Sequence, residues 1–189
     1  MRTEFLFIAM IFSGLCSCEE AASPKPHGEL RIDLPDHSYI PTTVPCPFNS
    51  EVSELCLEVL RKNADGNCWL DLSYPEQNAT VYLTYKPVQG DLKMLLDEAH
   101  KLTYEHHVLA DGILTRNFTD TLDHVYGTFF ELSGEVASNT QFYLTDSTKH
   151  FLRGALYFNS IPNEDSLAPV TRYIREDMIH FIEELHWKD

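Results

Sequence analysis

The densest group of reactive side chains in this sequence lies in one short segment that follows Leu144. The segment offers an aspartate, a serine and a histidine. A serine nucleophile needs a base within hydrogen-bond reach and a group that orients the base, and these residue types can supply both. The candidate residues are Asp146, Ser147, Thr148, Lys149 and His150, with Arg153 beyond them.

Closeness in sequence argues against catalysis by this segment. Neighbouring side chains in a strand point to opposite faces, and a turn of about four residues offers no preformed oxyanion hole. The segment is then an Asp- and Ser-rich hairpin turn or an exposed recognition loop in which Lys149 and Arg153 contact a partner. We predict an interaction loop, and a hydrolase that uses Asp146 to His150 is the alternative.

The histidines do not have the spacing of a metal site. His106 and His107 are adjacent and would project to different sides of a helix, whereas two ligands on one face need a separation of three or four residues. His100 and His107 are about two turns apart, which is marginal for one ion. The sequence also has no glycine-rich phosphate loop. We therefore predict no metal and no cofactor.

A second kind of chemistry is indicated near the N-terminus, where a cysteine follows a signal-like segment. Arg2 supplies a positive charge, and the apolar run 5–15 is too short to cross a bilayer, which needs roughly 20 residues. The small residues before Cys18 resemble a bacterial lipobox, in which the cysteine is acylated after cleavage. Cys16 is the competing site, although bulky Leu15 directly precedes it. An ordinary exported protein without a lipid is the remaining alternative.

This assignment divides the chain into three parts. Residues 1–17 are the predicted signal peptide, 18–28 the acylated cysteine with a flexible tether, and 29–189 a single globular α+β domain. The formal net charge is −15, with 14 Lys and Arg against 29 Asp and Glu. Nucleic acid is excluded as a partner because phosphate binding needs clustered basic residues. Contact with the membrane is expected through the N-terminal lipid.

Three cysteines follow the predicted lipidation site. An exported chain meets an oxidising compartment, so one disulfide and one remaining thiol are expected. Cys46 lies between two prolines in a rigid loop and Cys68 begins a predicted strand, and we therefore predict a Cys46–Cys68 disulfide. Cys56 has apolar neighbours and is expected to be a buried thiol. The other pairings stay open.

The elements that must position these groups follow from hydrophobic periodicity. Strands are predicted over 30–34, 52–60, 69–74, 79–85, 126–132, 140–145 and 151–158, although 52–60 also suits a helix. Apolar stripes predict helices over 92–109 and from Asp165 or Ser166 to Leu185. The polar segment 112–123 is predicted as a loop. This order predicts an α+β fold, with a mostly antiparallel sheet of about six to seven strands covered by two long amphipathic helices.

The segment from Phe142 to Phe158, FYLTDSTKHFLRGALYF, resembles the GldD family of gliding motility lipoproteins of the Bacteroidetes. The likeness extends over essentially the whole mature chain. It includes the segments Pro24-Lys25-Pro26, Cys46-Pro47-Phe48, Ala79-Thr80-Val81-Tyr82, Leu102-Thr103-Tyr104-Glu105-His106 and Trp187-Lys188.

The resemblance implies a cell-envelope lipoprotein that is needed for gliding and for the associated type IX secretion system. It implies a non-enzymatic role in stabilising partners, which would be other gliding motility or type IX secretion lipoproteins and envelope proteins. No catalytic residues carry over from the family. The expected location is lipid-anchored at the outer membrane, and Glu19-Glu20 after Cys18 resemble signals that sort such lipoproteins to the outer face.

Overall fold

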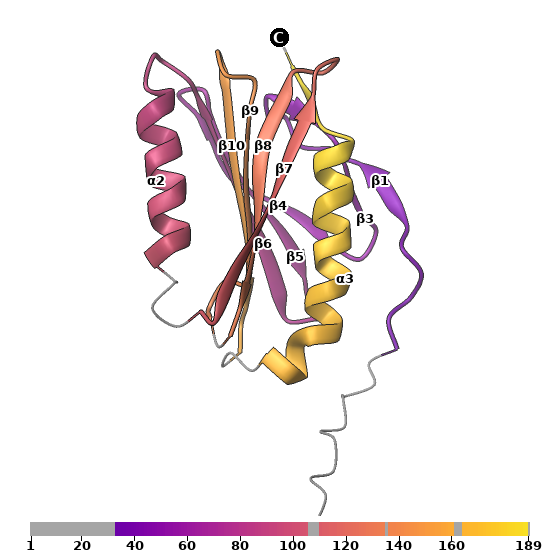
Figure 1. The fold of residues 1–189 in the computed structure, drawn as a ribbon. Helices are drawn as coiled ribbons and strands as arrows, with labels where there is room; N and C mark the ends of the chain where they lie inside the picture. The colour runs from indigo at the N-terminus through magenta and orange to yellow at the C-terminus, as the bar shows by residue number, and fades with distance from the viewer. Residues whose placement is uncertain (1–32, 106–109, 135, 161–163, 189) are drawn as a thin grey trace, which may run out of the picture.

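The computed structural model describes residues 33–105, 110–134, 136–160 and 164–188 (Figure 1). The predicted signal peptide, Cys18, the tether, His106 and His107 lie outside the described residues. The elements in chain order are β1 (Tyr39–Pro41), β2 (Phe48–Asn49), β3 (Glu51–Ser53), β4 (Leu57–Ala64), β5 (Asn67–Tyr74), β6 (Ala79–Pro87), α2 (Leu92–Glu105), β7 (Gly112–Asp120), β8 (Val125–Ser133), β9 (Thr140–Thr145), β10 (His150–Phe158), α3 (Glu164–Glu183) and β11 (His186–Trp187).

The main sheet is antiparallel and has seven strands in the order β4-β5-β6-β10-β9-β8-β7. Two meanders, β4 to β6 and β7 to β10, join through β6 and β10. These two strands pair along their whole length, from His150 opposite Pro87 to Phe158 opposite Ala79. Strands that are distant in the sequence therefore form the middle of the sheet.

Tight turns connect the strands at positions that tolerate a left-handed backbone. Asp65 and Gly66 have φ values of 55° and 74° between β4 and β5, which is the conformation that Asp-Gly favours in short hairpins. His124 has a φ of 52° before β8, and Ser147 has a φ of 69° between β9 and β10. Local sequence thus fixes where the chain reverses direction.

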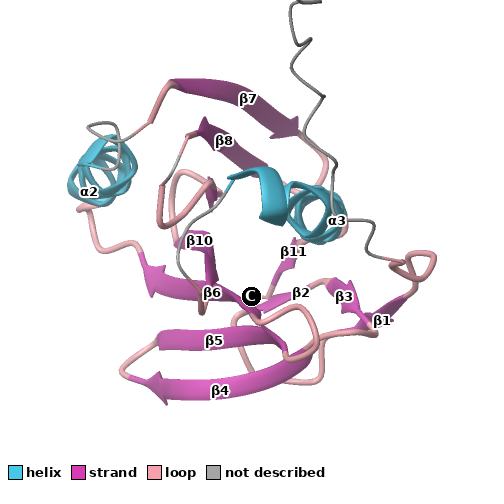
Figure 2. Cartoon of the chain, turned by 90° about the horizontal axis from the view of Figure 1, so that it is seen from below, coloured by secondary structure: helices cyan, strands magenta, loops and turns pink. Residues whose placement is uncertain are grey.

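The two faces of the sheet contact different helices. Alternate residues such as Phe142 and Leu152 point to the face that packs against α3, where Ile174 is fully buried. The opposite face contacts α2, whose Leu95 packs near Phe151 of β10. Figure 2 shows α3 within the curve of the sheet and α2 outside it. We call these the inner and the outer face.

The N-terminal part of the described chain wraps around α3, and we call residues 37–56 the strap. β1 pairs with β3, and β2 pairs with β11 beyond the end of α3. Ser50 Oγ donates a hydrogen bond of 2.6 Å to the carbonyl of Phe181 in α3. The predicted disulfide between Cys46 and Cys68 is confirmed, with 5.6 Å between the Cα atoms, and it links the strap to β5.

Cys56, the remaining thiol of the described chain, is buried, as predicted. Burial raises its pKa to about 12, and the nearby carboxylates of Asp177 and Glu58 add to the increase. A thiol with such a pKa is protonated at neutral pH and is a poor nucleophile.

The α+β class and the antiparallel sheet are confirmed, but other predictions need correction. The segment predicted as a loop, 112–123, contains strand β7. This strand lies at the edge of the sheet and most of its residues are exposed, so it lacks the apolar alternation that reveals a strand. Asp33 and Leu34 are not in a strand, and the rest of that predicted strand lies outside the described residues.

Both predicted helices are present, but a pair of long helices covering the sheet is not confirmed, and residues 106–109 of the first predicted helix lie outside the described residues. α2 has 14 residues and α3 has 20, and α2 ends at Glu105 within the described chain. In the ranges that the structure describes, neither helix is long and apolar enough to span a bilayer.

Candidate functional site

The predicted interaction loop forms the turn between β9 and β10, and Asp146 organises it. Its Oδ1 accepts hydrogen bonds from the backbone N–H groups of Thr148, Lys149 and His150 at 2.9, 2.8 and 2.8 Å. Its Oδ2 accepts one from the Thr148 hydroxyl at 2.7 Å. Partial burial alone would raise the pKa of Asp146, but these hydrogen bonds outweigh it and lower the pKa to about 2. The carboxylate therefore has a structural role in the turn.

The structure does not bring the six predicted residues together on one surface. Ser147, Thr148 and Lys149 are exposed at the tip of the turn. His150 is buried, its Nδ1 lies 2.7 Å from the Tyr85 hydroxyl, and its ring stacks on Trp187 at 4.9 Å.

Arg153 lies on the outer face, because strand alternation separates it from His150. Its guanidinium donates a hydrogen bond of 2.7 Å to Gln141. The contacts thus assign Asp146 to a turn and His150 to a buried stack. They favour the hairpin-turn interpretation over a hydrolase.

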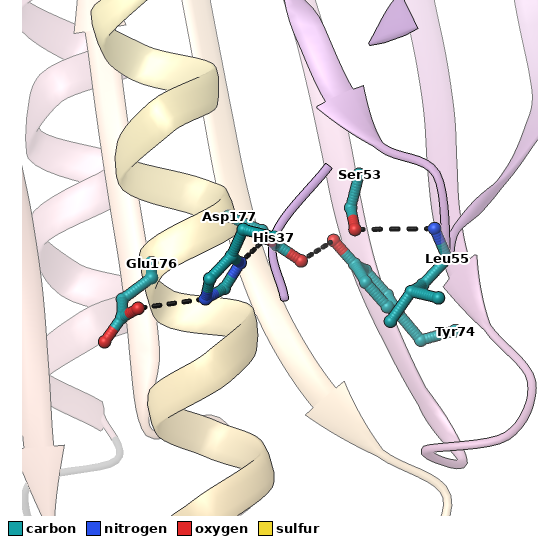
Figure 3. Close-up of polar contacts among 6 residues, drawn as sticks. All are labelled: His37, Ser53, Leu55, Tyr74, Glu176 and Asp177. Atoms are coloured by element: carbon teal, nitrogen blue, oxygen red, sulfur yellow. Dashed lines mark hydrogen bonds and ion pairs between the residues drawn. The ribbon is translucent and has the colours of Figure 1, made fainter. Parts of the chain in front are cut away.

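A different polar cluster, which the sequence analysis did not find, lies beneath the strap (Figure 3). At its centre is Asp177 of α3, whose side chain is only 2% exposed. The Asp177 carboxylate lies 2.7 Å from Nδ1 of His37 and accepts a hydrogen bond of 3.1 Å from the Tyr74 hydroxyl. Nε2 of His37 lies 2.9 Å from the carboxylate of Glu176. The cluster therefore joins the strap, β5 and α3.

Burial dominates the electrostatics of this cluster. Loss of solvent raises the pKa of Asp177, although hydrogen bonds from His37, Tyr74 and Ser53 act in the opposite direction. The pKa of Tyr74 lies well above its ordinary value, because the phenol is buried and stands next to the Asp177 carboxylate. A buried carboxylate is tolerated only when its oxygens have partners, and here these partners come from separate elements.

Aromatic stacking reinforces the same contact between the strap and α3. The His37 ring stacks on Tyr173 with 4.0 Å between centroids, and the Tyr39 ring stacks on His180 at 3.6 Å. Nε2 of His180 lies 2.8 Å from the carboxylate of Glu51 in β3. Rings of the strap thus lie flat against rings of α3.

These contacts hold the strap against α3 and leave little space for a substrate beside His37. Both ring nitrogens of His37 face carboxylates, so neither is available to a substrate. The adjacent cavity, lined in part by Val52, Tyr74 and Asp177, has a volume of only about 10 Å³, which at most admits a single water molecule. Within the described part of the chain, no group of three or more His, Cys, Asp or Glu residues could hold a metal ion.

One sequence signal could have located the cluster. Asp177 stands in the apolar stripe of the last helix, three residues after Ile174 and four before Phe181. A lone acidic residue at this spacing points into the core and must find partners there. The partners themselves could not be named, since 140 and 103 positions separate Asp177 from His37 and Tyr74.

Together, the fold and the cluster define an α+β domain in which histidine, tyrosine and carboxylate side chains hold the strap on α3. A family profile described as gliding motility lipoprotein GldD matches residues 19–187. The chain therefore belongs to the GldD family of gliding motility lipoproteins. Family membership implies a role in gliding motility and a lipid-anchored location in the cell envelope. No curated protein matches the chain significantly.

Replacing His37 by alanine should loosen the strap. The substitution removes a hydrogen bond to the buried Asp177 carboxylate, and we expect the free energy of unfolding in urea to fall by about 2 kcal/mol. Amide hydrogen exchange should accelerate over β1 and β3. The control is His186→Ala, whose histidine pairs with Asp123 but is 55% exposed, and it should lose less than about 1 kcal/mol. Equal losses in the two variants would show that the cluster does not fasten the strap.

Replacing Asp146 by asparagine should change the pH dependence of stability. The pKa of Asp146 is lowered from 3.8 to about 2, so its ionised form stabilises the fold above pH 3.8, and this contribution disappears as the pH falls through about 2. Allowing for solvent screening, Asp146→Asn should lose about 1 kcal/mol at pH 7 and progressively less on acidification. Asp97→Asn, at an exposed pair with Lys93, is the control. A difference between wild type and Asp146→Asn that stays constant from pH 7 to pH 2 would contradict this role.

Proposed function

We propose that this protein is a non-enzymatic lipoprotein that supports the gliding motility and type IX secretion apparatus by binding and stabilising partner lipoproteins. The family match supports the motility setting. The observation that carries the non-enzymatic part is the cluster around Asp177, because its hydrogen bonds hold the strap on α3 and its cavity is too small for a substrate.

In this proposal Cys18 carries the lipid, and residues 18–28 connect it to a domain that spans 29–189. The cluster at His37 is 19 residues beyond Cys18 in the sequence. A fully extended chain of that length reaches about 60 Å, so the domain can stand clear of the headgroups. The net charge of −15 disfavours contact with anionic lipid and leaves the surface of the domain free for proteins. The proposed location is the outer membrane.

Two surfaces of the domain are accessible to a partner in the region that the sequence analysis singled out. The tip of the β9–β10 turn exposes Ser147, Thr148 and Lys149. The outer face of the sheet carries Arg153. These are separate candidate surfaces, since the turn and the outer face point in different directions.

The lipid anchor can be tested in cells grown with labelled palmitate. We expect label on the wild-type protein and on Cys16→Ala, but not on Cys18→Ala, because only the acylated cysteine receives the fatty acid. Cys18→Ala should also be released from membranes and should abolish gliding. Label that persists after Cys18→Ala would show that this cysteine is not the attachment site.

The non-enzymatic role predicts a further pattern in the same cells. Ser147→Ala and His150→Ala should preserve gliding wherever the protein remains folded, and wild-type protein should recover motility or secretion components from envelope extracts. Loss of gliding in folded Ser147→Ala and His150→Ala protein would favour the hydrolase.

A further inference from the structure

Strand register places aromatic and cationic side chains side by side on the outer face. One cross-strand row consists of Lys62, Trp69, Thr84 and Arg153. The next row begins with Val59, Asp71 and Tyr82. These rows come from four neighbouring strands, β4, β5, β6 and β10. We call Val59, Lys62, Trp69, Tyr82 and Arg153 the outer platform.

The outer platform is partly open to solvent, since three of its members are exposed and Lys62 and Arg153 are half-buried. Trp69 is 44% exposed, Tyr82 is 40% exposed and Val59 is 36% exposed. α2 packs farther along the same face, near Phe151. In Figure 2 no element of the described chain lies across the outer side of β4 and β5. Among the described residues, α2 covers the part of this face near Phe151, and Val59, Trp69 and Tyr82 remain exposed beside it.

A groove runs along the boundary between the outer platform and α2. Its volume is about 210 Å³, large enough for an inserted side chain. One wall comes from the sheet and the other from the helix. The lining includes Trp69, Lys86 and Arg153 on the sheet, and Leu95, Ala99 and Leu102 on α2. Glu98 of α2, the partner of Lys86, also lines the groove. The helical wall is therefore apolar apart from this one carboxylate, and the sheet wall combines aromatic rings with Lys86 and Arg153.

The charge of this region is opposite to that of the whole chain. Among 14 basic and 29 acidic residues, four basic ones gather here: Arg61, Lys62, Lys86 and Arg153. Asp71 pairs with Arg61 at 2.6 Å, and Glu98 pairs with Lys86 at 3.3 Å. The other two cations form no ion pair with described residues, and the Lys62 ammonium lies 5.1 Å from the centre of the Trp69 ring. A local excess of positive charge therefore surrounds exposed aromatic rings.

We propose that the outer platform and its groove dock an acidic segment of a partner protein, with an apolar side chain of that segment inserted against Trp69. Charge complementarity selects this occupant. A chain of net charge −15 repels an acidic segment over most of its surface, whereas Lys62 and Arg153 attract one here. Exposed tryptophan and arginine are also the residue types that dominate binding energy at protein interfaces. The inference rests on the proposed function, since it identifies the surface through which partners are bound.

The test uses the full domain and two fluorescein-labelled decapeptides that each contain one central tryptophan. One peptide carries glutamates around the tryptophan and the other carries lysines. We expect fluorescence anisotropy to show saturable binding of the acidic peptide, at least ten-fold tighter than binding of the basic one and weakened by added salt. Trp69→Ala should weaken it at least ten-fold. Lys62→Glu should also weaken binding of the acidic peptide at least ten-fold, because it reverses a charge on the outer platform. This second variant tests the proposal even if Trp69→Ala disturbs the packing of the sheet.

The control variant is Lys93→Ala, which removes a cation that is 92% exposed on α2, pairs with Asp97 and does not line the groove. It should bind the acidic peptide within two-fold of wild type. Equal binding of the two peptides, or unchanged binding by folded Trp69→Ala and Lys62→Glu, would overturn the proposal. So would saturable binding of a neutral oligosaccharide without peptide binding, or self-association that is lost in Trp69→Ala.

Envelope pull-downs separate this inference from the proposed function. If wild type recovers motility components and Trp69→Ala recovers them equally well, the docking surface is wrong and the proposed function stands. If wild-type protein recovers no such component, the proposed function itself fails.

Discussion

The buried carboxylate of Asp177 is the constraint on which the arrangement of the strap depends. An ionised carboxylate inside a protein destabilises the fold by several kcal/mol unless hydrogen bonds replace its water. Here His37 supplies one of those bonds from the strap and Tyr74 supplies another from β5, and the His37 ring also stacks on Tyr173 of α3. Separating the strap or β5 from α3 would remove one or more of these partners from the buried carboxylate. The disulfide from Cys46 to Cys68 adds a covalent link between the same strap and β5. The N-terminal segment, the central sheet and the last helix therefore hold one another in a single arrangement.

In the described part of the chain, histidine and aspartate side chains have structural roles. Histidine and aspartate are used to join elements, and Asp146 is used to shape a turn. The inner face of the sheet is filled by α3, so surface chemistry is left to the outer face. There Val59, Trp69 and Tyr82 of β4, β5 and β6 are exposed, and the neighbouring strands bring cations into register with the two rings. A domain of this kind, in a lipoprotein of the cell envelope, suits a protein that acts through binding.

Local patterns predicted the parts of the fold that local physics determines. Aromatic and β-branched residues indicated the strands at β9 and β10, the turn between β4 and β5 contains Asp65-Gly66, and rigid flanking prolines indicated the pairing of Cys46. β7 was not predicted because most residues of this edge strand are exposed, so its sequence lacks the apolar alternation that indicates a strand. The residues of the predicted interaction loop do not share one surface, because side chains alternate along β10 and His150 and Arg153 therefore lie on opposite faces of the sheet. The cluster around Asp177 was hidden because its partners meet only in the folded chain.

Site-specific photo-crosslinking in living cells tests most directly whether this protein works by docking a partner on its outer platform. A photoreactive residue would replace Tyr82 on the outer face or, as a comparison, Leu114 on edge strand β7, which is 72% exposed. Binding at the outer platform predicts a specific crosslink to a motility or secretion component from position 82 and none from position 114. A crosslink to such a component from position 114 alone would contradict this account.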